Sequence, residues 1–518
     1  MCAWPDTSKE AGADSRGPTK EPSLLDALVP LGTMVVLIGG ALLLFGLDAL
    51  DGPIQVALVL CAMVAALVAM KNGHSWEDVQ AAAQGSLASI TSAIFILLAV
   101  GALIGVWNLS GTIPTIVYYG IQLLSASWYY AASALICGIV AISIGSSWTT
   151  AGTIGVGLVG IAHALGVSPE ITAGAVVSGA YLGDKTSPLS ETTVLASQMV
   201  GVDVHQHIKR QVWTSLPAYA LAMVAFLLLG LFWGPSVDRP APESVELTAL
   251  NGIFHITPLN LLPLVLLAGL SVRKVPASLA LTAATLFAGV CGALLQPEVV
   301  QGFAEGGGGS VLESIKAVWQ AAATGFQMDS GIGDVDRLVS RGGMSSMLPT
   351  VWLIIGAVTF GALLQDFGLI SRLIDPVIAA AKTTGRLFAS VFATALGLNL
   401  VAGDQYIALV LPTKVFRAEF TRRDLAPTNL SRLTADCGTV TSALVPWNSC
   451  GAFMSAVLGV STLSYLPYAF FNIASPLLSV GYGITGFKVE RVEPVDVAAP
   501  VSAEPPAGSE RDQPRGRP

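Results

Sequence analysis

A short polar segment between Gly183 and Thr193, GDKTSPLSETT, carries the residue types that could bind a small cation. It supplies the carboxylates of Asp184 and Glu191, the ammonium group of Lys185 and five hydroxyl groups around one proline. Hard cations prefer oxygen ligands, and a proline break in a helix frees backbone carbonyls as well. We predict a cation site in which the two carboxylates hold the ion and hydroxyls complete its shell, namely those of Thr186, Ser187, Ser190 and Thr192.

Other segments of the chain could supply further oxygen ligands. Asp436 is the only acid of ADCGTVTSALVPWNSCG, residues 435–451, and Asp404 lies at a break in apolar sequence. We predict that these two acids bind ions or protons together with the carboxylates of the first segment. Neutral oxygen donors complete the predicted set: Ser146, Ser147, Thr149, Thr150, Thr441, Ser442 and Asn448.

Structural roles are the alternatives for the same residues. Asp184 and Lys185 could form an ion pair while Glu191 caps a helix, and Asp404 could also be a helix cap. The hydroxyl groups could simply join helices, at about 0.6 kcal/mol per hydrogen bond. In the functional interpretation, Lys185 is the charge partner of the acids.

The surrounding sequence is typical of a membrane protein. From Gly85 to Pro169 the chain runs for 85 residues without Asp, Glu, Lys or Arg. Charged residues make up 12% of the whole chain, about half the share of a soluble domain. A charge at the centre of a bilayer costs at least about 2.5–3.5 kcal/mol, so ionisable groups retained there are functional candidates. We predict an all-α polytopic membrane protein with 11–14 membrane segments.

Several apolar segments are interrupted by polar residues. Pro188 and Pro446 lie inside stretches that are too long and too polar for simple spans. Non-helical backbone at membrane depth persists only where protein or a water-filled cavity satisfies its polar groups. We predict broken or re-entrant helices at four places, 143–155, 170–200, 397–406 and 430–460.

The second half of the chain repeats short patterns of the first half. VSP at 167–169 matches LAP at 425–427, and ASQMVGV at 196–202 matches MSAVLGV at 454–460. The offset between such matches drifts from 240 to 258 residues, as an insertion would cause. We predict two transmembrane repeats, 25–235 and 256–488, an external linker at 236–255, and disordered tails at 1–24 and 489–518.

The distribution of charge predicts how the two halves face the membrane. Lys71, Lys209–Arg210 and Arg273–Lys274 flank apolar segments, whereas the loop at 235–255 is acidic. Basic loops stay in the cytoplasm, so the acidic loop lies outside. The first half then starts inside and the second half starts outside. This pattern predicts an inverted repeat with its binding site near the midplane of the membrane.

Several functional classes find no support in the sequence. We find no G-x-S-x-G, H-E-x-x-H, Walker A or dinucleotide-binding motif, which predicts that the protein is not an enzyme and is not driven by ATP. The six cysteines lack the spacing of a disulfide framework or a metal site. No basic field for nucleic acid is present. We predict no cofactor, no resident metal and no nucleic-acid partner. The lipid bilayer surrounds the chain, and the sequence leaves open whether it forms a homodimer.

Five segments together resemble the NhaC family of Na+/H+ antiporters, and the resemblance covers most of residues 25–486. It implies a secondary transporter of a prokaryotic inner membrane that exports Na+ and admits H+ by alternating access. It also implies that the acids of the family motifs fall on Asp184, Glu191, Asp404 and Asp436. The segments are GALIGVWNLSGTIPTIVYYG at 101–120, GSSWTTAGTIGVGLVGIA at 145–162, GDKTSPLSETT at 183–193, NLSRLTADCGTVTSALVPWNSCG at 429–451 and LGVSTLSYLPYAFFN at 458–472.

The chain departs from the family pattern at four of these positions. Glu191, Val194, Cys437 and Ala443 stand where the family more often has Asp, Asn, Ser and Pro. These changes alter ligand geometry and leave the preference between Na+ and Li+ open. The family includes malate/lactate antiporters, for which Lys185 or a helix N-terminus could bind the organic anion. An ion-coupled organic-acid antiporter is therefore one alternative, and a polytopic membrane enzyme is an alternative from another class.

Overall fold

The structure is a computed structural model that describes residues 19–233, 245–304 and 311–492. Most of each predicted tail falls outside these residues, whereas the predicted linker at 236–255 is described from residue 245 onward, where α11 (Val245–Ile253) lies. The described part is helical, and nine of its helices are long and apolar enough to cross a membrane, or ten if one bent pair counts as a span. These nine are Leu24–Asp51, Pro53–Lys71, Trp76–Leu109, Ala126–Ile144, Ser147–Leu165, Val204–Phe232, Ala277–Leu295, Met344–Asp366 and Thr384–Val401.

The all-α, multi-pass architecture confirms the predicted fold class. The nine long helices are fewer than the 11–14 predicted segments because several apolar segments form shorter pieces. Examples are α8 (Pro169–Thr186) with α9 (Glu191–Val200), and α22 (Ser449–Leu458) with α24 (Phe470–Thr485). Large apolar side chains such as Leu43 and Leu231 point outward, as expected for a surface that faces lipid.

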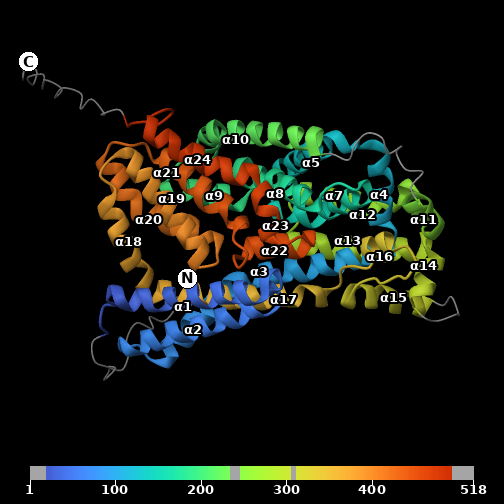
Figure 1. Cartoon of the computed structure of the whole chain (residues 1–518), viewed down its shortest axis with the longest axis horizontal. Helices are drawn as coiled ribbons and strands as arrows, with labels where there is room; N and C mark the ends of the chain where they lie inside the picture. Colours follow the sequence, from blue (N-terminus) through green and yellow to red (C-terminus); the bar gives the residue numbers. More distant parts are fainter. Residues whose placement is uncertain (1–18, 234–244, 305–310, 493–518) are drawn as a thin grey trace, which may run out of the picture.

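The helices form two groups in Figure 1. Along the lower side of the view, α1 (Leu24–Phe45), α2 (Pro53–Lys71), α3 (Trp76–Leu109) and α17 (Leu348–Asp366) pack side by side. Along the upper side, α8 packs against α5, α10 and α24. The bounds of the two helices not yet given are Tyr129–Ile144 for α5 and Val204–Trp233 for α10.

All four predicted breaks are present in the backbone. The break between α5 and α6 (Ser147–Thr150) lies at Gly145–Ser146, and the break between α8 and α9 lies at Ser187–Ser190. In the second half, three residues separate the end of α19 (Thr384–Val401) from the start of α20 (Gln405–Arg422). The last break, at Val445–Asn448, precedes α22.

The helix boundaries of the two halves match at a constant offset. α6 and α20 begin 258 residues apart, as do α8 and α21 (Pro427–Thr434), and α9 and α22. α21 continues through a π-helical turn and a 3-10 turn to Leu444, so it has the same end as α8 at this offset. This correspondence supports two repeats, while their inverted orientation stays a prediction.

The drift of the offset also has a structural explanation. AAAQG at 81–85 lies in α3, which is continuous, whereas its match AAATG at 321–325 ends α15 (Val311–Thr324). Residues 325–347 then separate α15 from α17. This segment, which we call the insert, accounts for the change in offset from 240 to 258 residues.

Candidate functional site

Four helices begin at the wall of a single cavity of about 1020 Å³, which we call the cation cavity. They are α6, α9, α20 and α22, which follow the four breaks of the backbone. Ser146, Ser190, Asp404 and Ser449 mark these four ends, and each of them lines the cavity. Helix N-termini carry partial positive charge, so they stabilise carboxylates gathered in the space between them.

Two glycines at corresponding positions of the two halves allow neighbouring breaks to approach closely. Gly145 has a positive φ of 78°, and a Cβ added to it would lie 2.7 Å from the backbone of Leu189. Gly403, 258 residues later, has a positive φ of 62°, and its carbonyl accepts a hydrogen bond from the Ser449 N–H at 2.9 Å. Both positions need the left-handed backbone that glycine adopts without strain.

Asp184 is a buried acid of the cation cavity, at the end of α8 just before the break. Its side chain accepts hydrogen bonds from the N–H of Ser147, at 3.1 Å, and from the Ser147 hydroxyl. Its backbone carbonyl accepts three more, from the hydroxyls of Ser190, Thr192 and Thr193 at 2.7–2.9 Å. These hydrogen bonds connect the two sides of the break at Asp184. The Asp184 carboxylate retains lone pairs that can accept a ligand in the cavity.

Glu191 lies at the first position of α9 and is exposed to the cavity. Its carboxylate accepts a hydrogen bond of 2.9 Å from the hydroxyl of Tyr406, which belongs to α20 in the other half. Glu191 therefore joins the two halves across the cavity while remaining open to solvent. Both Glu191 and Asp184 line the cation cavity.

Asp404 has the capping role that the sequence left as one alternative, and its role in binding an ion or a proton stays a prediction. It caps α20, because its carboxylate accepts a hydrogen bond from the N–H of Ile407 at 2.9 Å. It also lines the cation cavity, and only 8% of the residue is exposed. An N-cap uses one carboxylate oxygen and leaves the other oxygen available to a ligand.

Lys185 and Asp436 lie outside the cation cavity and pair with each other. Their ion pair is fully buried, and it links α8 to the π-helical turn that follows α21. Ser475 on α24 also contacts both groups, and Lys185 lies 5.3 Å from the ring centre of Phe471. The structural alternative of an Asp184–Lys185 pair is therefore not what the geometry shows: the partner of Lys185 is Asp436.

The predicted hydroxyl and amide ligands divide into two groups. Five of them line the cation cavity: Ser146, Ser147, Thr149, Ser190 and Thr192. Six others are engaged in hydrogen bonds within the protein and do not line it: Thr150, Thr186, Ser187, Thr441, Ser442 and Asn448. The cavity is thus built mainly by the ends of helices, which project their first residues into it.

Sequence reasoning missed several polar residues of the cavity wall. Gln405 and Tyr406 directly follow Asp404, so the break itself was a signal for them. Ser86, Ser89 and Ser92 recur every third residue along apolar α3, which places them on one face of that helix. Lys274 and Asp366 also contribute to the wall, where neighbouring segments approach it.

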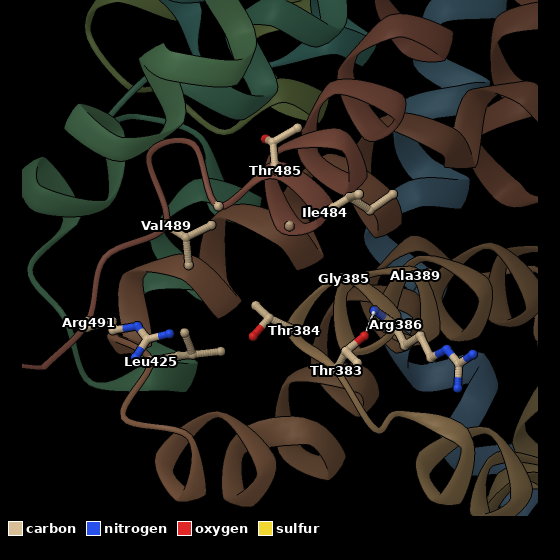
Figure 2. A pocket seen from close by; sticks show the side chains of 12 residues that line it. Thr383, Thr384, Gly385, Arg386, Ala389, Leu425, Ile484, Thr485, Val489 and Arg491 are labelled. Atoms are coloured by element: carbon tan, nitrogen blue, oxygen red, sulfur yellow. Dashed lines mark hydrogen bonds between the residues drawn. The ribbon is translucent and has the colours of Figure 1, made fainter.

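A second hollow, shown in Figure 2, is unsuited to a cation. Its volume is about 620 Å³, and it lies between the start of α19 and the end of α24. The charged residues of its wall, Arg386 and Arg491, are basic, and no acid is among the described residues that line it. By contrast, four acids and a single lysine line the cation cavity.

Comparison with known proteins agrees with the resemblance inferred from the motifs. The profile of one family, described as "Na+/H+ antiporter family", matches residues 19–234 and 179–487. The chain is 37% identical to the Na(+)/H(+) antiporter NhaC of Alkalihalophilus pseudofirmus, over 84% of this chain and 91% of that protein.

Two other relatives are named for organic solutes. The arginine/ornithine antiporter ArcD of Halobacterium salinarum is 35% identical, over 92% of this chain and 95% of that protein. The malate-2H(+)/Na(+)-lactate antiporter of Bacillus subtilis is 32% identical, over 90% and 95%. The family thus contains proteins named for different substrates, and the choice among them depends on the site.

Proposed function

Because the chain belongs to the Na+/H+ antiporter family, we propose that it is a secondary transporter that exchanges Na+ for H+ across the cell membrane. The observation that carries this proposal is the position of Asp184. It is a nearly buried carboxylate at a helix break, and it lines a large polar cavity. An uncompensated charge is costly at such a place, so the carboxylate is expected to hold either a cation or a proton.

In this proposal, one set of oxygens alternates between the two ions. Asp184, Glu191 and Asp404 provide the charge that balances Na+, and the hydroxyls of the cavity wall complete its oxygen shell. When Na+ leaves, a proton neutralises the buried carboxylate in its place. Binding of the two ions is then mutually exclusive, which is the requirement for coupled exchange.

The direction in which the cation cavity opens follows from the charge distribution. Its wall reaches Lys274, in one of the basic clusters assigned to the cytoplasm. The residues of α3 that line it, 82–96, belong to the half of this helix that follows Lys71, another cytoplasmic basic residue. We infer that the structure represents the form that is open to the cytoplasm.

Exchange of an organic solute is the second candidate. The cavity is far larger than one ion requires, since a water molecule occupies only about 30 Å³ in the liquid. Four helix N-termini could bind a carboxylate, while the acids favour an ammonium or guanidinium group. A cationic amino acid would use both features, whereas a dicarboxylate such as malate would face four acids and only one lysine.

Transport by the purified protein in proteoliposomes tests the proposal. An outward-directed Na+ gradient is expected to drive H+ into the vesicles, which a pH-sensitive dye measures. Li+ and K+ are compared at equal concentration. Uptake of labelled arginine, malate and lactate is measured in the same vesicles. Organic solute exchange without any Na+-dependent H+ flux would replace the proposal with the second candidate.

A further inference from the structure

A further cavity, which we call the small cavity, lies beyond the cation cavity along α3 and α22. Its volume is about 290 Å³, and it is bounded by the insert, α3 and the last turns of α22. Its polar wall comes mostly from the insert, with Gln327, Ser340, Arg341 and Ser346, and its apolar wall includes Ile104. The proposed ion site contributes no residue to this cavity.

The two cavities lie along the same helices. On α22, Cys450 lines the cation cavity and Ala456 lines the small cavity, six residues further on. On α3, the corresponding residues are Ile96 and Ile104. With a rise of 1.5 Å per residue, the separation is about 9 Å along α22 and about 12 Å along α3. The two cavities therefore lie roughly two helical turns apart along both helices.

An aromatic pair lies between the levels of the two cavities, where Trp148 lines the cation cavity and Phe453 lies between Cys450 and Ala456 on α22. Trp148 of α6 stacks on Phe453 of α22, with ring centroids 4.1 Å apart and an interplanar angle of 14°. Phe453 is fully buried, and so is Val100 on α3 beside it. A Cβ added to Gly152 would lie 3.1 Å from Val100 and 3.9 Å from the Phe453 ring, so these side chains pack without a gap at this level. The two rings come from different halves of the chain.

The corresponding residues of the other half do not form an aromatic stack. At the offset of 258 residues, the counterparts of Trp148 and Phe453 are Tyr406 and Leu195. Tyr406 lines the cation cavity and is 45% exposed. Trp148 also lines the cation cavity but stacks on Phe453, whereas no aromatic ring among the described residues stacks on Tyr406. This asymmetry is expected when two repeats alternate in closing the two ends of one pathway.

The insert forms the far wall of the small cavity, and hydrogen bonds attach it to α3 and α22. Gly343 has a φ of 87°, and its N–H donates to the carbonyl of Gly101 in α3 at 2.7 Å. The guanidinium of Arg341 donates to the carbonyl of Leu458, at the end of α22, at 3.2 Å. The insert therefore contacts the C-terminal end of α22, whose N-terminal end lies at the cation cavity.

We propose that the small cavity is the outer access chamber of the transport pathway, and that the Trp148–Phe453 stack is the gate between it and the cation cavity. The inference rests on the proposed function only for the identity of the ion that passes. α3 runs from the cytoplasmic Lys71 end past the cation cavity to Ile104, so the small cavity lies on the outer side. Separation of the two rings would connect the chamber to the ion site.

Thiol labelling tests the proposal without any transport measurement. In a variant with all six cysteines replaced, Ser346→Cys places a thiol in the small cavity and Ser89→Cys places one in the cation cavity. A membrane-impermeant thiol reagent is applied to right-side-out and to inverted vesicles. We expect Ser346→Cys to be labelled only from the outer face, and Ser89→Cys only from the cytoplasmic face. Labelling of Ser346→Cys from the cytoplasmic face would overturn the proposal.

Removal of the stack tests the gate itself. Trp148→Ala or Phe453→Ala is expected to abolish the sidedness, so that Ser346→Cys also reacts from the cytoplasmic face, whereas Trp148→Phe preserves it. Trp352→Ala, a change of the same kind at a half-exposed position of α17, is the matched control and keeps the sidedness. Unchanged sidedness in both alanine variants would contradict the gate. Because labelling needs no Na+, this result is independent of whether Na+/H+ exchange is confirmed.

Discussion

Lys185 forms a fully buried ion pair with Asp436, although its neighbour in the chain, Asp184, is also an acid. Successive residues of an α-helix point about 100° apart, so Asp184 faces the cation cavity while Lys185 faces the interior of the second half. The pair joins α8 to the helix that corresponds to it in the repeat. One broken helix thus presents a cavity-lining carboxylate on one side and an ion-paired ammonium group on the other.

The first prediction concerns this pair. Lys185→Met or Asp436→Asn alone leaves an unpaired buried charge and is expected to cost about 3–5 kcal/mol of stability. The double variant Lys185→Met/Asp436→Leu removes both charges and is expected to recover most of that loss. Thermal unfolding in detergent measures the effect, and the partly exposed pair Arg210–Glu490 serves as control, with an expected cost of at most about 1 kcal/mol.

The same double variant examines the predicted ion-binding role of Asp436. Since Asp436 does not line the cation cavity, we expect the stable double variant to show Na+-dependent H+ flux. A stable double variant without any flux would instead restore Asp436 to the ion-binding set.

The second prediction separates the two roles of Asp404. Asparagine caps helices as well as aspartate does, whereas alanine does not. Asp404→Asn is therefore expected to retain the stability of the wild type but to lose Na+ affinity, while Asp404→Ala loses about 0.5–2 kcal/mol of stability as well. Unfolding curves and the Michaelis constant for Na+ are measured side by side. Normal Na+ affinity in Asp404→Asn would reduce Asp404 to a helix cap.

The third prediction concerns the hydrogen bonds that orient Asp184. Ser147→Ala removes the hydroxyl donor and keeps the backbone donor. A hydrogen bond to a charged group contributes about 1.5–3 kcal/mol, so the Michaelis constant for Na+ is expected to rise about tenfold or more. Ser143→Ala is the control, because its hydroxyl only bonds the Ile139 carbonyl within α5 on an exposed face. Equal Na+ constants in both variants would show that Ser147 does not position the carboxylate.

The fourth prediction uses two glycines that end corresponding helices. Gly201 and Gly459 have similar positive φ angles of 75° and 68°, so alanine introduces similar backbone strain, about 1–3 kcal/mol, at either position. Only Gly459 packs against the guanidinium of Arg341, while nothing lies within 4 Å of a Cβ at Gly201. We expect Gly459→Ala to be the less stable variant in thermal unfolding. Equal losses would mean that the Arg341 contact is unimportant.

The sequence predicted the parts of the site that depend on local signals. Prolines, glycines and hydroxyls mark the four backbone breaks, and these breaks place Asp184, Glu191 and Asp404 around one cavity. The partner of Lys185 could not be predicted, because it depends on which face of α8 meets the second half. The Trp148–Phe453 stack joins residues 305 positions apart, so no local pattern reports it.

The most direct test of the central claim is Na+-dependent H+ flux in proteoliposomes containing Asp184→Asn, Glu191→Gln or the wild type. Asp48→Asn, at an exposed carboxylate after α1, is the matched control. If Asp184 and Glu191 exchange Na+ for H+, both neutralised variants lose most of the flux while the control retains it and all proteins unfold at similar temperatures. Full flux in both neutralised variants would contradict the account.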